Sequence, residues 1–282
     1  MYDPVLREQL RLLARVQPSS WVGYLSSTGV YGDHQGEWVD ERSECKTVSG
    51  RGIVRKEHED AWLAAGARLG LPMHILRLGG IYGPARSILN SIRSEAQQDT
   101  STSKRRRAKQ RYTSRVHVRD ICSVVLASIE RPRAGDILNV VDNEPAPRQQ
   151  VLAFAIALQE PGTPSIHGPT AQDSPSAPAL QQAAPQPPAC VPVTETSATT
   201  GVPVRSATPP EAVAGVSGGR RSERPEAVEE KRVRNSMITQ ELGVVLEFPT
   251  YKEGVSAIHG GVIAPFTAAD IRFLQGIRNR EN

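Results

Sequence analysis

Two arginines one helical turn apart are the first candidates for chemistry in this sequence. Arg51 and Arg55 stand at i and i+4 in the segment GRGIVRKEHEDAW, which places both side chains on one face of a helix. Forked guanidinium donors at this spacing can bind a phosphate or a carboxylate. They cannot transfer protons, because an arginine pKa above about 12 keeps the side chain charged. Two solvated arginines beside Glu57 and Glu59 are the alternative interpretation.

Hydroxyl side chains follow the short apolar run WVGYLS at 21–26. Ser27 and Thr28 come directly after this run and can form a hydrogen bond with a substrate carbonyl or alcohol. Ligands of open α/β sheets bind at the carboxyl ends of strands, which favours a functional role, whereas turn residues capping a strand end are the alternative. The loop beyond them contains three side chains that can in principle act as a base, although each is also typical of a loop surface: Tyr31, His34 and Glu37.

Composition argues against metal-binding, disulfide-rich and membrane-spanning classes of protein. The three cysteines, Cys45, Cys122 and Cys190, show no CxxC spacing, so neither a metal site nor a disulfide framework is expected. The formal charge of +4 is mild and does not by itself indicate a nucleic-acid partner. No apolar run approaches the ~18 residues that cross a bilayer, so no membrane partner is expected. We expect a soluble intracellular protein, with the cytoplasm and a plastid both left open.

The segments around these candidates alternate between helix and strand. Apolar spacing predicts a helix over 4–16, a buried strand over 21–26, a helix over 50–69 and a second buried strand within 73–84. Strand, helix and strand in this order predict an α/β fold with a doubly wound parallel sheet. The later elements predicted are a strand at 115–118, a helix over 120–129 capped by Asp120, a strand over 136–142, and helices over 148–158 and 235–242.

A long polar stretch interrupts the folded pattern. From about 160 to 230 the chain consists mainly of Pro, Ala, Ser, Thr and Gln, with almost no Ile, Leu or Phe. Such a segment buries too little apolar surface to offset the ordering entropy of ~1–2 kcal/mol per residue. We therefore predict a partial Rossmann-like domain over 1–159, a large disordered insertion over 160–230, and a helical segment over 231–282 that completes the substrate side. A smaller polar insertion is predicted near 94–110.

A basic run, KRRRAKQR at 104–111, suggests a different class of function. Its composition is that of a phosphate-binding or nuclear localisation patch. Tyr112 is the one nearby aromatic residue, so the interleaving of basic and aromatic residues typical of single-strand binders is absent. A solvated loop is the favoured interpretation, and a nucleic-acid partner is not expected.

Four segments carry a resemblance to a known family. They are YLSSTGVYGD at 24–33, LRLGGIYGP at 76–84, SRVHVRDI at 114–121 and ILNVVDNEP at 137–145. In this order they resemble the extended short-chain dehydrogenase/reductase superfamily, in particular its NAD-dependent epimerase/dehydratase-like proteins. The segment KRVRNSMITQELG is similar to the last helix of that family.

The resemblance implies a Rossmann-like fold, NAD or NADP as cofactor, and a small-molecule substrate, anionic or sugar-nucleotide-like. It places Ser27 at the catalytic Ser/Thr position. Arg51 and Arg55 take the positions of the Tyr-x-x-x-Lys catalytic pair, so the usual proton-transfer tyrosine is missing; a register one residue later, with Gly52 and Lys56, lacks it too. The cofactor side would comprise Ser26, Leu78, Gly79, Gly80 and Ile81, and the substrate side would comprise Thr28, Tyr31 and Arg115.

One family feature is missing from the sequence. No glycine-rich strand–turn–helix that could cradle a pyrophosphate occurs in the 282 residues. We therefore expect an incomplete, N-terminally truncated Rossmann-like fold that binds NAD or NADP weakly or not at all. The uncovered edge of strand 21–26 favours self-association. The leading hypothesis is an epimerase/dehydratase-like protein with altered catalytic residues. The alternatives are a non-catalytic interaction protein that uses the loop 104–111, and an inactive truncated gene product.

Overall fold

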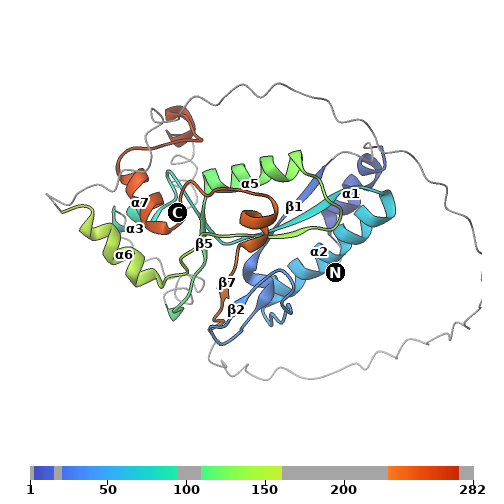
Figure 1. Ribbon diagram of the computed structural model, residues 1–282, viewed down its shortest axis with the longest axis horizontal. Helices are drawn as coiled ribbons and strands as arrows, with labels where there is room; N and C mark the ends of the chain where they lie inside the picture. The colour runs from blue at the N-terminus through green and yellow to red at the C-terminus, as the bar shows by residue number, and fades with distance from the viewer. Residues whose placement is uncertain (1–2, 16–20, 94–108, 161–227, 273–282) are drawn as a thin grey trace, which may run out of the picture. The chain divides into compact units, whose positions relative to one another are not determined.

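Three parallel strands form the central sheet of the computed structural model, which describes residues 3–15, 21–93, 109–160 and 228–272. The strands are β1 (Val22–Ser27), β3 (Met73–Leu78) and β6 (Ile137–Val140), in the order β1-β3-β6 (Figure 1). The α/β class and the parallel pairing predicted from the sequence are confirmed. Within the described residues β1 pairs with β3 alone, and self-association through its other edge stays a prediction.

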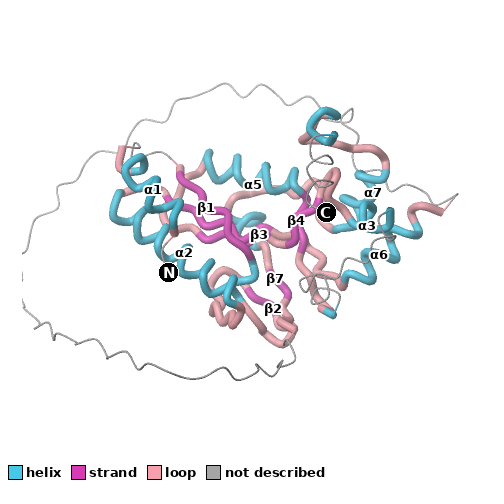
Figure 2. The backbone as a smooth tube through the Cα atoms, turned by 180° about the vertical axis from the view of Figure 1, so that it is seen from behind, coloured by secondary structure: helices cyan, strands magenta, loops and turns pink. Residues whose placement is uncertain are grey.

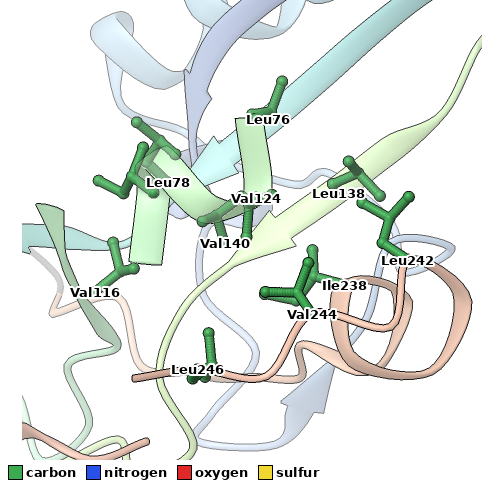
Figure 3. Close-up of a cluster of buried hydrophobic side chains, with 11 residues drawn as sticks. Leu76, Leu78, Val116, Val124, Leu138, Val140, Ile238, Leu242, Val244 and Leu246 are labelled. Carbon is green, nitrogen blue, oxygen red and sulfur yellow. The ribbon is translucent and has the colours of Figure 1, made fainter. Parts of the chain in front are cut away.

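Helices cover both faces of this sheet, as expected for parallel strands that are apolar on both sides. On one face, α1 (Pro4–Leu13) and α2 (Gly50–Leu69) pack on Met73 and Ile75 of β3. On the other face, α5 (Val118–Glu130) and a π-helical turn, η2 (Met237–Glu241), pack on Leu76 and Leu78. Figure 3 shows this second cluster, in which Val124 and Ile238 lie on opposite sides of Val140. Alternate residues of β3 therefore point into two separate cores.

The smaller elements lie beyond the carboxyl ends of the strands. A 3-10 turn, η1 (Thr28–Tyr31), follows β1 directly. Two short parallel pairs are β4 (Gly80–Tyr82) with β5 (Arg115–His117), and β2 (Trp38–Val39) with β7 (Arg232–Val233). The second pair can be followed in Figure 2. A third cluster of apolar side chains joins α3 (Ile88–Arg93), α6 (Arg148–Ala157) and α7 (Tyr251–His259).

Local sequence explains where α2 begins and ends. Ser49 caps its first turn, since the Ser49 hydroxyl accepts a hydrogen bond from the Gly52 amide at 3.2 Å. Gly70 ends it in the left-handed conformation, with φ at 64°. The predicted limits of 50–69 are confirmed.

Two local predictions differ from the structure, and one helix was not predicted. The predicted strand within 73–84 is two strands in different sheets, because Gly79 and Gly80 turn the chain toward β5, where the Gly80 amide donates to the Ser114 carbonyl at 2.9 Å. Asp120 does not cap α5: His117 does, with Nδ1 accepting from the Arg119 amide at 3.2 Å. Helix α7 was not predicted; it begins at a capping box formed by Thr250 and Glu253.

The predicted insertion over 160–230 lies outside the described residues except for 160 and 228–230, and most of the predicted insertion near 94–110 lies outside them as well. The division into three regions stays a prediction. Within the described part of the chain, no helix is long and apolar enough to cross a membrane.

Candidate functional site

A row of polar side chains crosses the sheet near the carboxyl ends of its strands. Ser26 in β1, Arg77 in β3 and Asn139 in β6 are register neighbours, and all three are buried. Glu59 of α2 lies over the row and is fully buried. Its Oε2 accepts from Arg77 Nη2 at 2.7 Å, and its Oε1 accepts from the Ser26 hydroxyl. Ser26 is thus bonded to the protein's own carboxylate, while its assignment to the cofactor side stays a prediction.

Tyr31 belongs to the same network. Its hydroxyl donates to Asn139 Oδ1 at 2.8 Å and accepts from Arg77 Nη1 at 3.0 Å. The Arg77 guanidinium carbon lies 4.8 Å from the centre of the fully buried Tyr31 ring. Burial raises the pKa of Tyr31 to about 12, so this phenol holds its proton throughout the physiological range. A role for Tyr31 as a base or as a substrate contact would require the network to open.

Ser27 and Thr28 lie where β1 meets β3. The Ser27 hydroxyl accepts a hydrogen bond from the Gly29 amide at 3.1 Å and caps the η1 turn. The Thr28 hydroxyl lies 3.5 Å from the Leu78 carbonyl of β3, to which it donates. The structure therefore brings these two predicted site residues together with the Leu78 end of β3. Both hydroxyls also serve the local turn, and the catalytic assignment of Ser27 stays a prediction.

The backbone after β3 was predicted to contact the nicotinamide end of NAD(P). Here its donors are already used, since the Gly79 amide donates to the Val140 carbonyl at 3.1 Å and the Gly80 amide to that of Ser114 at 2.9 Å. A Cβ at Gly79 would lie 2.9 Å from the Ser114 carbonyl oxygen, so close packing of the chain on itself accounts for this glycine. None of the described strand–helix junctions contains a glycine-rich turn. The described residues therefore do not fit the pyrophosphate of a dinucleotide.

Arg51 and Arg55 line an open groove of about 410 Å³ between α2 and β1. The groove is completed by Tyr24, Gly50, Val54 and His58. Arg55 Nη1 donates to the Leu25 carbonyl at 3.3 Å, which directs this side chain across the helix toward β1. The groove also lies along the first turns of α2, where the helix dipole is positive.

Contacts with Trp62 and Asp3 support two residues that line the groove, Tyr24 and His58. The Tyr24 ring stacks on Trp62 with ring centres 5.7 Å apart and planes at 24°. Trp62 Nε1 donates to Asp3 Oδ2 at 2.7 Å, and His58 Nδ1 lies 3.5 Å from the same oxygen. Asp3 also caps α1, since its Oδ1 accepts from the Val5 amide at 2.9 Å. Trp62 and Asp3 thus hold the Tyr24 and His58 side of the groove, opposite the charged side chains of Arg51 and Arg55.

Arg115 lies elsewhere, in β5. Its Nη1 donates to the carbonyls of Thr113 and Ala146 at 2.7 and 2.8 Å, and burial lowers its pKa. Its predicted substrate contact is not tested by these bonds. The two remaining loop candidates lie near the surface: His34 contacts the Glu44 carbonyl at 3.1 Å, and Glu37 is exposed.

Asp142 was missed from the sequence. It follows β6 and is 1% exposed, and neither of its carboxyl oxygens has a hydrogen-bond partner within the described residues. Burial raises its pKa to about 8, against the opposing effect of the Arg115 charge. An aspartate directly after the apolar run ILNVV was the available signal, since strand ends of open sheets are where functional side chains gather.

No model of a protein family matches the chain, and no curated protein matches it. Solved structures do match. A conserved protein of unknown function from Silicibacter pomeroyi DSS is 32% identical, with 93% of this chain and 74% of that chain covered and a TM-score of 0.58. A putative NAD-dependent epimerase/dehydratase from Methylobacillus flagellatus is 21% identical over 86% and 64% of the two chains, with a TM-score of 0.51.

A third match, RMD from Pseudomonas aeruginosa complexed with NADPH, is 15% identical over 86% of this chain and 66% of that chain, with a TM-score of 0.50. The chain thus spans about two thirds of the length of these last two proteins, which at this identity show the fold alone. The match at 32% identity covers most of both chains. It shows that the two proteins are relatives, and the structural neighbours of this chain are NAD-dependent epimerase/dehydratase proteins of the extended short-chain dehydrogenase/reductase family.

Proposed function

We propose that this protein is an epimerase/dehydratase-like family member that binds a small anionic substrate, of the sugar-nucleotide type, in the groove between α2 and β1. The observation that carries the proposal is the position of Arg51 and Arg55, which line this groove opposite Tyr24. By resemblance they occupy the places of the family's tyrosine and lysine. Where the family has a proton-transfer tyrosine and a lysine, this groove therefore has two positively charged arginines.

Guanidinium groups suit binding better than proton transfer. Each offers forked donors that match a phosphate or carboxylate, and each stays charged at every physiological pH. Tyr31, the one tyrosine in the loop after β1, is held in the buried network. By resemblance, Ser27 is the hydroxyl that would bond a substrate carbonyl or alcohol, although it does not line the groove. Because the described residues lack a pyrophosphate turn, the anion groove and not the dinucleotide carries the proposed function.

Calorimetric titration with UDP and UDP-glucose tests this proposal. A charge-assisted hydrogen bond is worth about 1.5–3 kcal/mol, so Arg51→Gln and Arg55→Gln should each weaken binding about tenfold or more. Arg51→Lys should give an intermediate loss, because it keeps the charge and loses the fork. Arg68→Gln, at the far end of α2, is the matched control and should bind as the wild type does. Equal affinities in all variants would refute the proposal.

A further inference from the structure

Arginine and aromatic side chains alternate on the surface around β2 and β7. The Arg111 guanidinium lies 5.7 Å from the centre of the Tyr112 ring, and that of Arg232 lies 5.1 Å from the same ring. Arg232 is also 5.0 Å from the Trp38 ring, over which Arg234 lies at 5.3 Å. We call these five residues, linked in this order, the arginine ladder.

Backbone contacts fix the ladder in place. Trp38 and Arg232 are register partners in the β2–β7 pair, whose strands lie side by side in Figures 1 and 2. Arg232 Nε donates to the Gly36 carbonyl at 2.8 Å. Gly36 has a φ of 84°, and a Cβ there would lie 3.0 Å from the Tyr112 ring, so a glycine is needed for the ring to approach. The ladder is therefore organised before any ligand arrives.

Glu230 anchors the Tyr112 end. Its two carboxylate oxygens accept the amides of Arg111 and Tyr112 at 2.9 and 3.2 Å, and its own amide donates to Asp33 Oδ1 at 2.9 Å. This carboxylate is thus used by the backbone. Glu230 thus fixes Arg111 and Tyr112 beside the start of the segment 228–272, which supplies Arg232 and Arg234.

The Glu230 carboxylate beside the ladder accepts backbone amides and is not paired with a ladder guanidinium. None of Arg111, Arg232 and Arg234 forms an ion pair with another of the described residues. Arg111 and Arg234, at the two ends, are exposed, and Trp38 is 39% exposed. A stacked arginine retains its N–H donors. The two exposed groups, Arg111 and Arg234, with Arg232 between the two rings, form a row of guanidinium donors that can contact anions.

We propose that the arginine ladder is a binding surface for single-stranded nucleic acid. A single strand offers what the ladder lacks: phosphates repeated along a chain, and bases that stack on aromatic rings or guanidinium planes. A nucleoside diphosphate has only two adjacent phosphates, which would contact one arginine of the ladder. An acidic peptide would satisfy the charges but would leave the aromatic rings without a role.

This surface was not visible in the sequence. The basic run 104–111 has Tyr112 as its one aromatic neighbour, whereas the other ring and the other two arginines come from β2 and β7 and the residue that follows β7. Folding supplies the interleaving of charges and rings that the local sequence lacks.

Fluorescence polarisation with labelled oligo-uridine and oligo-deoxythymidine of equal length tests the proposal, and comparing the two distinguishes RNA from DNA as the source. The protein should bind at least one of them, with an affinity that falls as salt rises. Arg111→Gln/Arg234→Gln should weaken binding about tenfold and reduce the salt slope by about 0.7 for each phosphate that the variant no longer neutralises. Both positions are exposed, and thermal unfolding checks that the variant is folded.

The matched control is Arg7→Gln/Arg68→Gln, which removes the same charge from exposed positions on α1 and α2 and should bind as the wild type does. The proposal is overturned if neither oligonucleotide binds, if both double variants lose affinity equally, or if poly-glutamate competes as well as the oligonucleotides. It is also overturned if the Lys104→Gln/Arg105→Gln/Arg106→Gln/Arg107→Gln variant loses binding while the ladder variant binds normally.

Discussion

Arg77 of β3 and Glu59 of α2 form an ion pair that is excluded from solvent, with side chains 2% and 0% exposed and Nη2 2.7 Å from Oε2. The pair joins the central strand to the helix that supplies Arg51 and Arg55. Because Glu59 lies one helical turn beyond Arg55, the ion pair fixes the rotation of α2 about its axis. The orientation of the groove arginines thus depends on this buried contact.

Removing one member of this pair should destabilise the protein strongly. Arg77→Met leaves Glu59 buried without its cation, which typically costs about 3–5 kcal/mol. Urea unfolding near neutral pH measures the loss. The control is Arg133→Met, since the Arg133–Asp136 pair at 2.9 Å is solvent-exposed on the arginine side and should contribute less than about 1 kcal/mol. Equal losses in the two variants would show that the buried pair has no special role.

Asp142 should make stability depend on pH. An aspartate in the unfolded chain titrates near 3.8, whereas burial raises the pKa of Asp142 to about 8 in the fold, against the opposing effect of the Arg115 charge. Between these values the folded state holds the additional proton, so the free energy of unfolding falls as pH rises from about 4 to about 8. We expect Asp142→Asn to remove this decline, which at about 1.4 kcal/mol per pKa unit amounts to roughly 5–6 kcal/mol. Urea unfolding at several pH values measures the free energy of unfolding of both proteins. If it falls with pH equally in the wild type and in Asp142→Asn, the assignment is contradicted.

The Tyr31 phenol should stay protonated at the pH, about 10, at which exposed tyrosines ionise. Its pKa of about 12 predicts that ultraviolet titration up to about pH 11 shows the same amplitude for the wild type and for Tyr31→Phe. A smaller amplitude in the variant would mean that Tyr31 titrates normally. The same substitution should cost about 1–2 kcal/mol, because Asn139 and Arg77 each lose a buried partner.

NADH and NADPH should bind this 282-residue chain only weakly. In doubly wound folds the pyrophosphate is held at a glycine-rich strand–helix turn, and none of the described junctions has one. Titration followed by nicotinamide fluorescence measures this. Saturation at low micromolar concentration would show that another part of the chain binds the dinucleotide.

Local patterns predicted the sheet because they follow directly from burial. The apolar run in β3 and the Ser49 and Gly70 limits of α2 are each encoded within a few residues. The buried network was not predictable in this way, since Ser26, Glu59, Arg77 and Asn139 meet only when three strands align. Asp120 was wrongly expected to cap α5, because its carboxylate accepts the amides of Glu247 and Phe248 from a distant segment. Side-chain roles set by long-range contacts leave no local pattern.

The most direct test of the proposed anion groove is the NMR response of arginine Nε–H groups to UDP. Binding in the groove predicts that the Arg51 and Arg55 signals shift and saturate together, while those of Arg7 and Arg68, which lie outside the groove, stay unchanged. A response confined to Arg111, Arg232 and Arg234, or no saturable response at all, would contradict a substrate-binding role for the groove between α2 and β1.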